Sequence, residues 1–180
     1  MWVFAYGSLM WAPEMPLAEA LPAAVEGWRR SFCMWSIHHR GTPEAPGLVL
    51  ALDRAPGARC EGLALRVAPG CEAEALARLR ARELVSSAYV ETRLETRLAD
   101  GRRVRALGYV VDPAHEQYCG GLPLPRQAEV IARARGGRGA NAEYLFNTVA
   151  HLRELGIREA DLEWLAREVA ARTAAASGAR

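Results

Sequence analysis

The stretch that decides the start of the fold is WVFAYGSL, residues 2–9. Its apolar and aromatic part, Trp2–Tyr6, is closed by Gly7 and Ser8, which predicts a buried strand that enters a tight turn. A glycine there lets the backbone turn sharply and approach a ligand, because no Cβ stands in the way. Successive N–H groups in such a turn can form a nest for a carboxylate or an oxyanion. An ordinary turn at the end of a strand is the alternative.

Strands and loops are predicted outward from this stretch to about residue 111. Tyr89–Leu98 and Arg102–Val111 flank Asp100 and Gly101, which predicts a hairpin with a type I′ turn, since that turn needs positive φ. Gly41–Gly47 contains two prolines and two glycines and is expected to be an irregular loop. The other predicted strands are Trp28–Ile37, Leu48–Leu52 and Cys60–Val67.

Helices are predicted once within this β region and throughout the last third of the chain. The four expected helices are Glu72–Leu84, Pro125–Arg135, one from Asn141 as cap to Leu155, and Arg158–Arg172. The pattern predicts an α+β fold, a mixed sheet or small barrel with helices packed on it. We expect a single domain over residues 1–172 and a mobile tail over residues 173–180.

Composition excludes several classes of protein. The chain has 180 residues, 51% of them hydrophobic, and a formal net charge of +2. This near-neutral balance argues against a nucleic-acid-binding domain. All 23 basic residues are arginine, which excludes a Schiff-base lysine and the lysine of a phosphate loop. The four cysteines are scattered, as in a protein with reduced thiols, and no stretch has the length of a membrane span. We therefore expect a cytoplasmic protein; its oligomeric state is not predicted.

Glu83 is the candidate for acid–base chemistry. In the helix Glu72–Leu84 it lies on the same face as Leu76 and Leu79, which directs a carboxylate toward the core. Carboxylates are rarely buried without a partner, so one interpretation is a general base whose pKa is raised by burial. The alternatives are a salt bridge to a nearby arginine, or a helix end that reaches solvent.

Other motifs give weaker indications. His38 and His39 are adjacent in a predicted strand, so their side chains point to opposite faces and cannot easily share a metal. The remaining histidines are isolated, and no metal site or cofactor is expected. Gly136–Gly139 follows a helix and has no lysine, which favours a helix-ending loop over a phosphate loop. Ser8 lacks the sequence context of a catalytic nucleophile.

Several segments, taken in chain order, resemble the ChaC family of γ-glutamylcyclotransferases, which act on glutathione. The resemblance extends from residue 1 to about residue 170, and the ordered set is more specific than any one motif. The segments are Val3–Trp11, Arg30–Cys33, Arg40–Glu44, Pro46–Leu50, Arg82-Glu83 with Tyr89, Gly136–Gly139, Asn141 with Glu143–Leu145 and Asn147-Thr148, and His151-Leu152 with Leu155–Ile157.

The resemblance implies a fold, a site and a reaction. The fold would be a small mixed β-barrel with flanking helices, and no cofactor or metal is implied. Glu83 would be the catalytic general acid/base. The residues that the resemblance assigns to the substrate's γ-glutamyl group are Val3, Phe4, Ala5, Tyr6, Gly7, Ser8, Leu9 and Tyr89.

In the implied reaction, the α-amino group of glutathione attacks its own γ-carbonyl, which forms 5-oxoproline and releases Cys-Gly. An α-ammonium with a pKa of about 8 is mostly protonated at neutral pH, so Glu83 would accept its proton and later deliver it to the leaving nitrogen. The N–H groups of Gly7–Leu9 would face the oxyanion. Arg40 is a further candidate, for binding a substrate carboxylate in a bidentate fork, or else for pinning the loop Gly41–Gly47.

Three functions are compatible with these residues. The first is a glutathione-specific γ-glutamylcyclotransferase. The second is a cyclotransferase for other γ-glutamyl amino acids or amines, since the Tyr6–Leu9 turn and Glu83 would serve any γ-glutamyl group. The third is a non-catalytic γ-glutamyl-binding protein, which Glu83 argues against because binding alone does not need a buried base.

Overall fold

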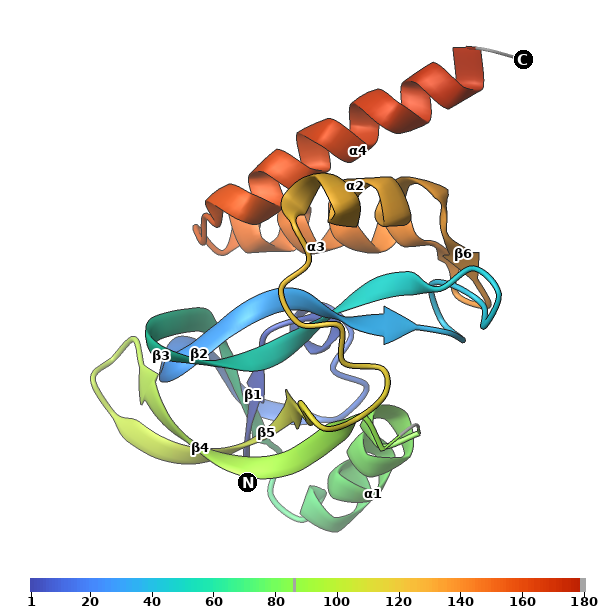
Figure 1. The fold of residues 1–180 in the computed structure, drawn as a ribbon. Helices are drawn as coiled ribbons and strands as arrows, with labels where there is room; N and C mark the ends of the chain where they lie inside the picture. The colour runs from blue at the N-terminus through green and yellow to red at the C-terminus, as the bar shows by residue number, and fades with distance from the viewer. Residues whose placement is uncertain (86, 179–180) are drawn as a thin grey trace. The chain divides into compact units, whose positions relative to one another are not determined.

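The structure is a computed structural model that describes residues 1–85 and 87–178. The chain forms two compact units (Figure 1). The first consists of Met1–Ser31 and Ala51–Tyr118, and the second of Phe32–Leu50 and Cys119–Arg180. The prediction of a single domain over residues 1–172 stays a prediction.

Five strands form a closed barrel. They follow the order β1-β3-β2-β4-β5 and are β1 (Trp2–Ala5), β2 (Leu17–Ser36), β3 (Gly47–Val67), β4 (Tyr89–Leu98) and β5 (Arg103–Val111). Most of the barrel belongs to the first unit; the end of β2 and the start of β3 are assigned to the second. β1 is antiparallel to β3 and parallel to β5, so the sheet is mixed. A short 3₁₀ helix η1 (Ser8–Met10) follows β1, and helix α1 (Glu72–Glu83) connects β3 to β4. The predicted α+β fold with a mixed barrel is confirmed.

The strand β1 separates two parts of the core. Successive side chains in a strand point to opposite faces. Phe4 therefore packs with barrel residues such as Leu52 and Leu94, whereas Val3 and Ala5 pack in a second cluster that includes Leu79 of α1. The side chains of Val3, Phe4 and Ala5 are at most 1% exposed, whereas Trp2 is partly exposed. Burial on both faces explains why this strand is apolar throughout.

Two of the strands are longer than the sequence predicted. Leu48–Leu52 and Cys60–Val67 belong to the single strand β3, and β2 begins at Leu17 rather than at Trp28. Proline and glycine at residues 56 and 57 read as a break, yet β3 continues through them, with Gly57 at a φ of 81°. Such positions absorb local bends in a strand without ending it.

The predicted hairpin between β4 and β5 is present, but its turn type was wrong. Gly101 has a φ of 92°, whereas Asp100 has no positive φ. The N–H of Gly101 donates to the carbonyl of Leu98 at 3.0 Å, as in a three-residue loop that ends with a left-handed residue. One glycine is therefore sufficient here, and the type I′ turn with two positive φ values is not formed.

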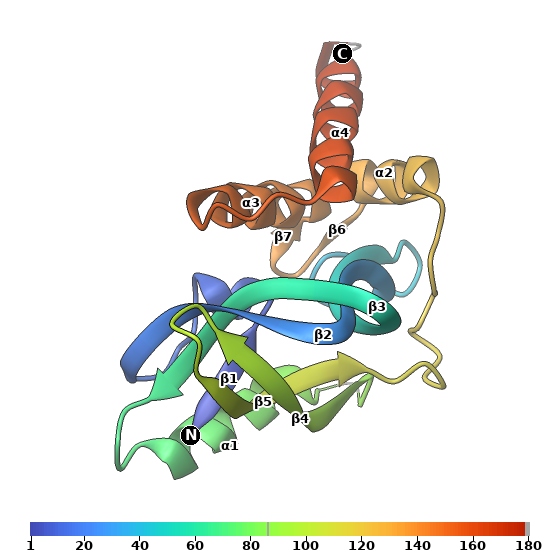
Figure 2. The same ribbon diagram turned by 90° about the vertical axis from the view of Figure 1, so that its left-hand side faces the viewer.

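The second unit is mainly helical (Figure 2). It contains α2 (Leu124–Arg133), α3 (Asn141–Glu154) and α4 (Ala160–Gly178), which pack against one another. The glycines after α2 form a small hairpin of β6 (Arg135–Gly136) and β7 (Gly139–Ala140). None of the helices among the described residues has the length and apolar composition of a membrane span.

Two predictions for the second unit need correction. Asn141 does not cap α3, because its side-chain amide exchanges two hydrogen bonds of 2.7 Å with the backbone of Leu48. Residues 173–178, predicted as a tail, continue the helix α4, since their alanine-rich sequence favours it. Residues 179–180 of that predicted tail lie outside the described residues.

Gly62 provides a test of the barrel. It is adjacent to Leu63, the last residue of β3 that pairs with β1. A Cβ at this position would overlap the carbonyl oxygen of Ala5. We expect Gly62→Ala to cost about 1–3 kcal/mol in the free energy of unfolding, because a backbone atom cannot yield as a side chain does. Thermal or denaturant unfolding measures this cost. Gly137→Ala is the milder comparison, since its Cβ would lie 3.3 Å from the carbonyl oxygen of His38 and a shift of a few tenths of an ångström is enough; equal stability of the two variants would contradict the prediction.

Candidate active site

The turn after β1 is held by the side chain and the carbonyl of Tyr6. The hydroxyl of Tyr6 donates to the carbonyl of Tyr109 at 2.8 Å inside the first unit. This bond uses the hydroxyl's proton, and the ring of Tyr6 lies 6.5 Å from that of Phe4. Tyr6 thus fixes the turn from within the barrel.

Arg30 of β2 holds the same residue from the other side. Its side chain is buried, and its Nε donates to the carbonyl of Tyr6 at 2.5 Å while another guanidinium nitrogen donates to the carbonyl of Glu61, also at 2.5 Å. The β1–β3 ladder ends at the pair Ala5 and Leu63, so both carbonyls lie just beyond it. Arg30 therefore joins the strands where they separate and fixes the peptide that leads into Gly7.

Glu83 is the last residue of α1. Its side chain is 17% exposed and lies 3.3 Å from the Nε of Arg82. The charge of Glu83 is also one of the causes that raise the pKa of Tyr109, which places the carboxylate close to that phenol. The prediction that α1 directs Glu83 inward is consistent with this burial, and the alternative prediction of a salt bridge to an arginine is also realised.

Arg82 connects Glu83 with the turn after β1. Its guanidinium donates to the hydroxyl oxygen of Ser8 at 2.8 Å and to the carbonyl of Ala12 at 2.7 Å. It also lies 3.2 Å from Glu14 and is only 13% exposed. One planar guanidinium with five donors can serve all these acceptors at once. The carboxylate of Glu83 and the turn that contains Ser8 are therefore held by the same group.

On the other side of Glu83, Arg80 attaches α1 to β4. Arg80 makes two hydrogen bonds of 2.7 and 2.8 Å to Glu91, which also accepts a bond of 3.3 Å from the hydroxyl of Tyr109. The bond from Arg80 holds the pKa of Glu91 below its ordinary value. Burial, followed by the charge of Glu91, raises the pKa of Tyr109, so this phenol keeps its proton.

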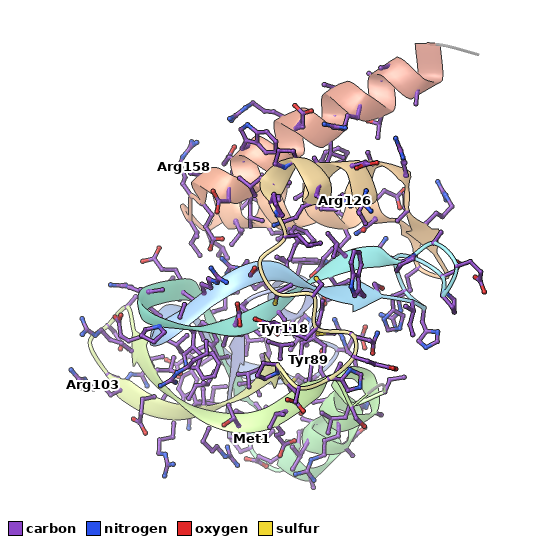
Figure 3. The ribbon with its side chains drawn as sticks, in the orientation of Figure 1. Met1, Tyr89, Arg103, Tyr118, Arg126 and Arg158 are labelled. Carbon is purple, nitrogen blue, oxygen red and sulfur yellow. The ribbon has the colours of Figure 1, made fainter. Side chains whose placement is uncertain are left out.

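The structure brings together only some of the predicted site residues. Val3, Phe4 and Ala5 have their side chains in the core, and so does Leu9, so only their backbone could meet a ligand. Ser8 is partly exposed next to Arg82. The remaining predicted residue of the first unit is Tyr89, which begins β4 opposite Val111 and packs against the cluster that contains Leu79 (Figure 3).

Arg40 lies in the second unit, where its guanidinium is engaged. It donates to the carbonyl of Ala140 at 3.1 Å, lies 3.8 Å from Glu143, and is placed over the ring of Tyr144. Its backbone N–H donates to Ser36. These contacts support the interpretation that Arg40 pins its own loop; its contact with a substrate carboxylate stays a prediction.

Sequence reasoning missed the residues that position the site. Arg30, Arg80 and Glu91 were not assigned a role, Tyr109 was expected to be a core or strand residue that could offer its hydroxyl to a polar ligand, and Arg82 was noted only as the neighbour of Glu83. Their contacts join segments far apart in the chain, such as Ser8 and Arg82, 74 positions apart. The only local signal is the spacing of Arg80 and Arg82 around the end of α1. Among the described residues no group of histidine, cysteine and acidic side chains could hold a metal ion.

Solved structures with a similar fold identify the architecture. A yeast crystal structure described as a γ-glutamyl cyclotransferase specific to glutathione has a TM-score of 0.87 with 23% identity, covering 96% of both chains. Another, described as a γ-glutamyl cyclotransferase, has a TM-score of 0.57 with 15% identity, covering 91% of this chain and 85% of the other. The barrel with its flanking helices is therefore the γ-glutamylcyclotransferase fold.

Sequence relatives place the chain within this fold class. The ChaC-like protein family matches residues 1–172. The glutathione-specific γ-glutamylcyclotransferase of Escherichia coli (strain K12) is 37% identical over 158 residues, which cover 88% of this chain and 68% of that protein. Glutathione-specific γ-glutamylcyclotransferase 1 of Homo sapiens is 32% identical over 163 residues, 89% of this chain and 73% of that protein. The chain belongs to the ChaC-like family.

The contact between α1 and β4 gives a prediction on acid stability. A carboxyl whose pKa is lowered by folding stabilises the protein above its unfolded pKa, and this contribution is lost as the pH falls through the folded pKa. Glu91 is such a group. We expect Glu91→Gln to lower the melting temperature at pH 7 by a few degrees and to have a smaller effect below about pH 4.

The matched control for this prediction is Glu95→Gln on the same strand. Glu95 pairs with Arg105, but both side chains are about three-quarters exposed. Exposed pairs contribute little to stability, so this variant should melt close to the wild type at either pH. A pH-independent effect of Glu91→Gln would show that its ionised form is not what stabilises the fold.

Proposed function

We propose that this protein is a glutathione-specific γ-glutamylcyclotransferase that converts glutathione to 5-oxoproline and Cys-Gly in the cytoplasm. Membership in the ChaC-like family and the names of its relatives support the reaction and the substrate. The observation that carries the proposal is the guanidinium of Arg82, which contacts both Glu83 and Ser8. The four cysteines are free, as expected for a reducing compartment.

The reaction is an exchange of one amide bond for another within the substrate. The α-amino nitrogen bonds to the γ-carbonyl carbon, the bond from that carbon to the cysteine nitrogen breaks, and one proton passes from the first nitrogen to the second. The protein must hold the chain in an attacking conformation, where effective molarity can lower the barrier by several kcal/mol. No second reactant is needed, because nucleophile and electrophile belong to the same molecule.

Glu83 is the proton carrier in this proposal. Its carboxylate accepts the proton of the attacking amine and returns it to the leaving nitrogen. Two contributions act on the carboxyl: partial burial favours its neutral form, and the adjacent Arg82 favours the carboxylate. The raised pKa that burial predicts for Glu83 therefore stays a prediction.

The turn after β1 supplies donors for the oxyanion. In the 3₁₀ helix η1 the first intrahelical bond runs from the N–H of Met10 to the carbonyl of Gly7. The N–H groups of Ser8 and Leu9 precede it and have no acceptor within the helix. Such donors stabilise the negative oxygen of a tetrahedral intermediate, and one is typically worth ~2.7–4 kcal/mol. Tyr89 is proposed to contact the same γ-glutamyl group.

The first experiment compares the wild type with Glu83→Gln on glutathione. Mass spectrometry should find 5-oxoproline and Cys-Gly in equal amounts for the wild type, and at least about a hundredfold less for the variant, because the amide cannot accept a proton. Glu74→Gln, on the exposed side of α1, is the matched control and should keep full activity. Wild-type turnover by Glu83→Gln would exclude Glu83 as the base.

The same assay separates the other functions. If the protein makes product from other γ-glutamyl amino acids or amines and none from glutathione, the proposed reaction is kept and the proposed substrate is wrong. Binding of glutathione by a folded protein that makes no product from any of these compounds would indicate a binding protein.

The second experiment removes the link between Glu83 and the turn. We expect Arg82→Ala to lower kcat by about a hundredfold, since a small misplacement of a reacting group has that order of effect. Arg82→Lys should retain only part of the wild-type kcat, because an ammonium cannot reach all the acceptors. Added guanidinium ion should restore part of the activity of Arg82→Ala.

The control for this experiment is Arg78→Ala, one turn earlier on α1. Arg78 makes only an exposed pair with Glu74, so its loss should leave kcat unchanged. An equal loss in both alanine variants would point to destabilised α1 instead of a lost link.

A further inference from the structure

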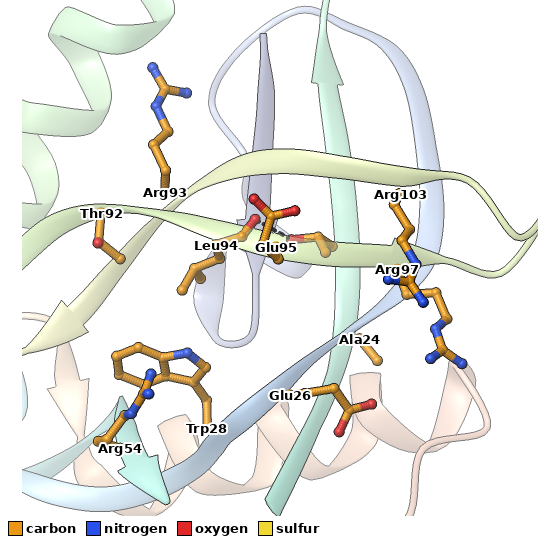
Figure 4. A pocket seen from close by; sticks show the side chains of 11 residues that line it. Ala24, Glu26, Trp28, Arg54, Thr92, Arg93, Leu94, Glu95, Arg97 and Arg103 are labelled. Atoms are coloured by element: carbon orange, nitrogen blue, oxygen red, sulfur yellow. Dashed lines mark hydrogen bonds between the residues drawn. The ribbon is translucent and has the colours of Figure 1, made fainter. Parts of the chain in front are cut away.

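A second site lies on the barrel of the first unit, apart from Glu83 and the turn after β1. A cavity of about 580 Å³ opens where β2 and β4 meet (Figure 4). Its volume is in the range of small-molecule sites, roughly 300–1,000 Å³. None of its lining residues belongs to the candidate active site. Those residues are Ala24, Glu26, Trp28, Arg54, Thr92, Arg93, Leu94, Glu95, Thr96, Arg97 and Arg103.

The apolar part of the cavity is formed by Trp28 and Leu94. Gly27 has a φ of 78° and changes the alternation of β2, so that Val25 and Trp28, three residues apart, both contact the same core cluster. Leu94 belongs to that cluster as well. The guanidinium of Arg54 lies 5.0 Å from the ring centre of Trp28. This part presents one flat surface, the exposed guanidinium of Arg54 over the Trp28 ring, against which a planar ring can stack.

The charged part of the cavity has an excess of two positive charges, from four arginines and two glutamates. Glu95 is engaged by Arg105 at 3.1 Å. Within residues 1–85 and 87–178, no ion pair uses Arg54, Arg93, Arg97 or Arg103. Arg93 acts electrostatically on Glu91, so an anion entering the cavity would meet the charges of Arg54, Arg97 and Arg103 first.

Arg97 and Arg103 make the strongest case for an anion. They lie directly opposite each other in the β4–β5 register, and Figure 4 shows their side chains next to each other. Like charges directly opposite on two strands destabilise a sheet. A phosphate between them would convert this repulsion into attraction, since two guanidinium groups bind its oxygens with charge-assisted hydrogen bonds.

We propose that this cavity binds a nucleoside diphosphate. Arg97 and Arg103 hold the phosphates, and the base stacks on the flat surface made by Trp28 and Arg54. The carboxylate of Glu26 is available to accept hydrogen bonds from the ribose or the base. This site does not depend on the proposed function, because it shares no residue with Glu83 or the turn after β1.

Direct titration tests the site without an activity assay. Calorimetry with ADP, pyrophosphate and adenosine separates the contributions of the ring and the phosphates. ADP should bind more tightly than either fragment, and its affinity should fall with added salt. The absence of ADP binding at millimolar concentration would overturn the proposal, and pyrophosphate binding as tightly as ADP would overturn the stacking on Trp28.

Variants on β4 and β5 locate the phosphates. We expect the double variant Arg97→Gln/Arg103→Gln to bind ADP at least about tenfold more weakly, because each lost guanidinium removes a charged hydrogen-bond donor. Arg78→Gln, on α1 and not among the lining residues, is the control and should bind like the wild type. Unchanged binding in the double variant would overturn the assignment.

A stability measurement gives a second, ligand-free readout. Removal of one like charge should relieve the repulsion, so Arg97→Gln alone should melt at a higher temperature than the wild type when no ligand is present. ADP should then raise the melting temperature of the wild type more than that of the variant. A lower melting temperature for ligand-free Arg97→Gln would contradict the repulsion on which the site is argued.

Discussion

The buried guanidinium of Arg30 is the interaction on which the site depends. Burying a charge is costly unless hydrogen bonds replace its water, and here the carbonyls of Tyr6 and Glu61 do so at 2.5 Å each. These carbonyls belong to the residue after β1 and to β3, just beyond the end of the β1–β3 ladder, and Gly62 lets the two backbones approach there. Since the hydroxyl of Tyr6 is bound to Tyr109 as well, the residue before Gly7 is fixed at both ends. The direction of the following N–H groups is a consequence of this arrangement.

The end of α1 shows why arginine suits this site. Arg80 and Arg82 lie on either side of Glu83 in the chain, and they bind different parts of the barrel unit. Exposed ion pairs are weak one at a time, but Arg82 is mostly buried and serves several acceptors from one planar group. A lysine has three donors on a single nitrogen and could not span the same set. Glu83 is therefore contacted by Arg82 and lies at the end of a helix that Arg80 attaches to β4.

Local patterns were sufficient for much of the fold. β4 was predicted with its observed bounds, and α1 within one residue, because each has a strong period and clear ends. The continuity of β3 could not be predicted, since proline and glycine at residues 56 and 57 resemble a turn in any short window. Helical periodicity identified Glu83, whereas its role came from the family resemblance. The contacts of Arg30 and Arg82 depend on partners brought close only by the closed barrel, so no spacing in the sequence indicates them.

The arginines of the barrel unit are of two kinds: some have their donors matched within the protein, and others have no ion-pair partner among the described residues. Arg30 and Arg82 are costly to bury, but their donors are matched by carbonyls, a hydroxyl and carboxylates of the same unit. Arg97 and Arg103 face each other in the β4–β5 register and take part in no ion pair among the described residues. Local rules are broken in natural proteins mainly where function requires it. A buried charge whose donors are all matched within the protein holds its partners rigidly, as at the turn after β1. Two like charges without an ion-pair partner at the edge of a cavity favour a ligand of opposite charge, because it can form charge-assisted hydrogen bonds with both.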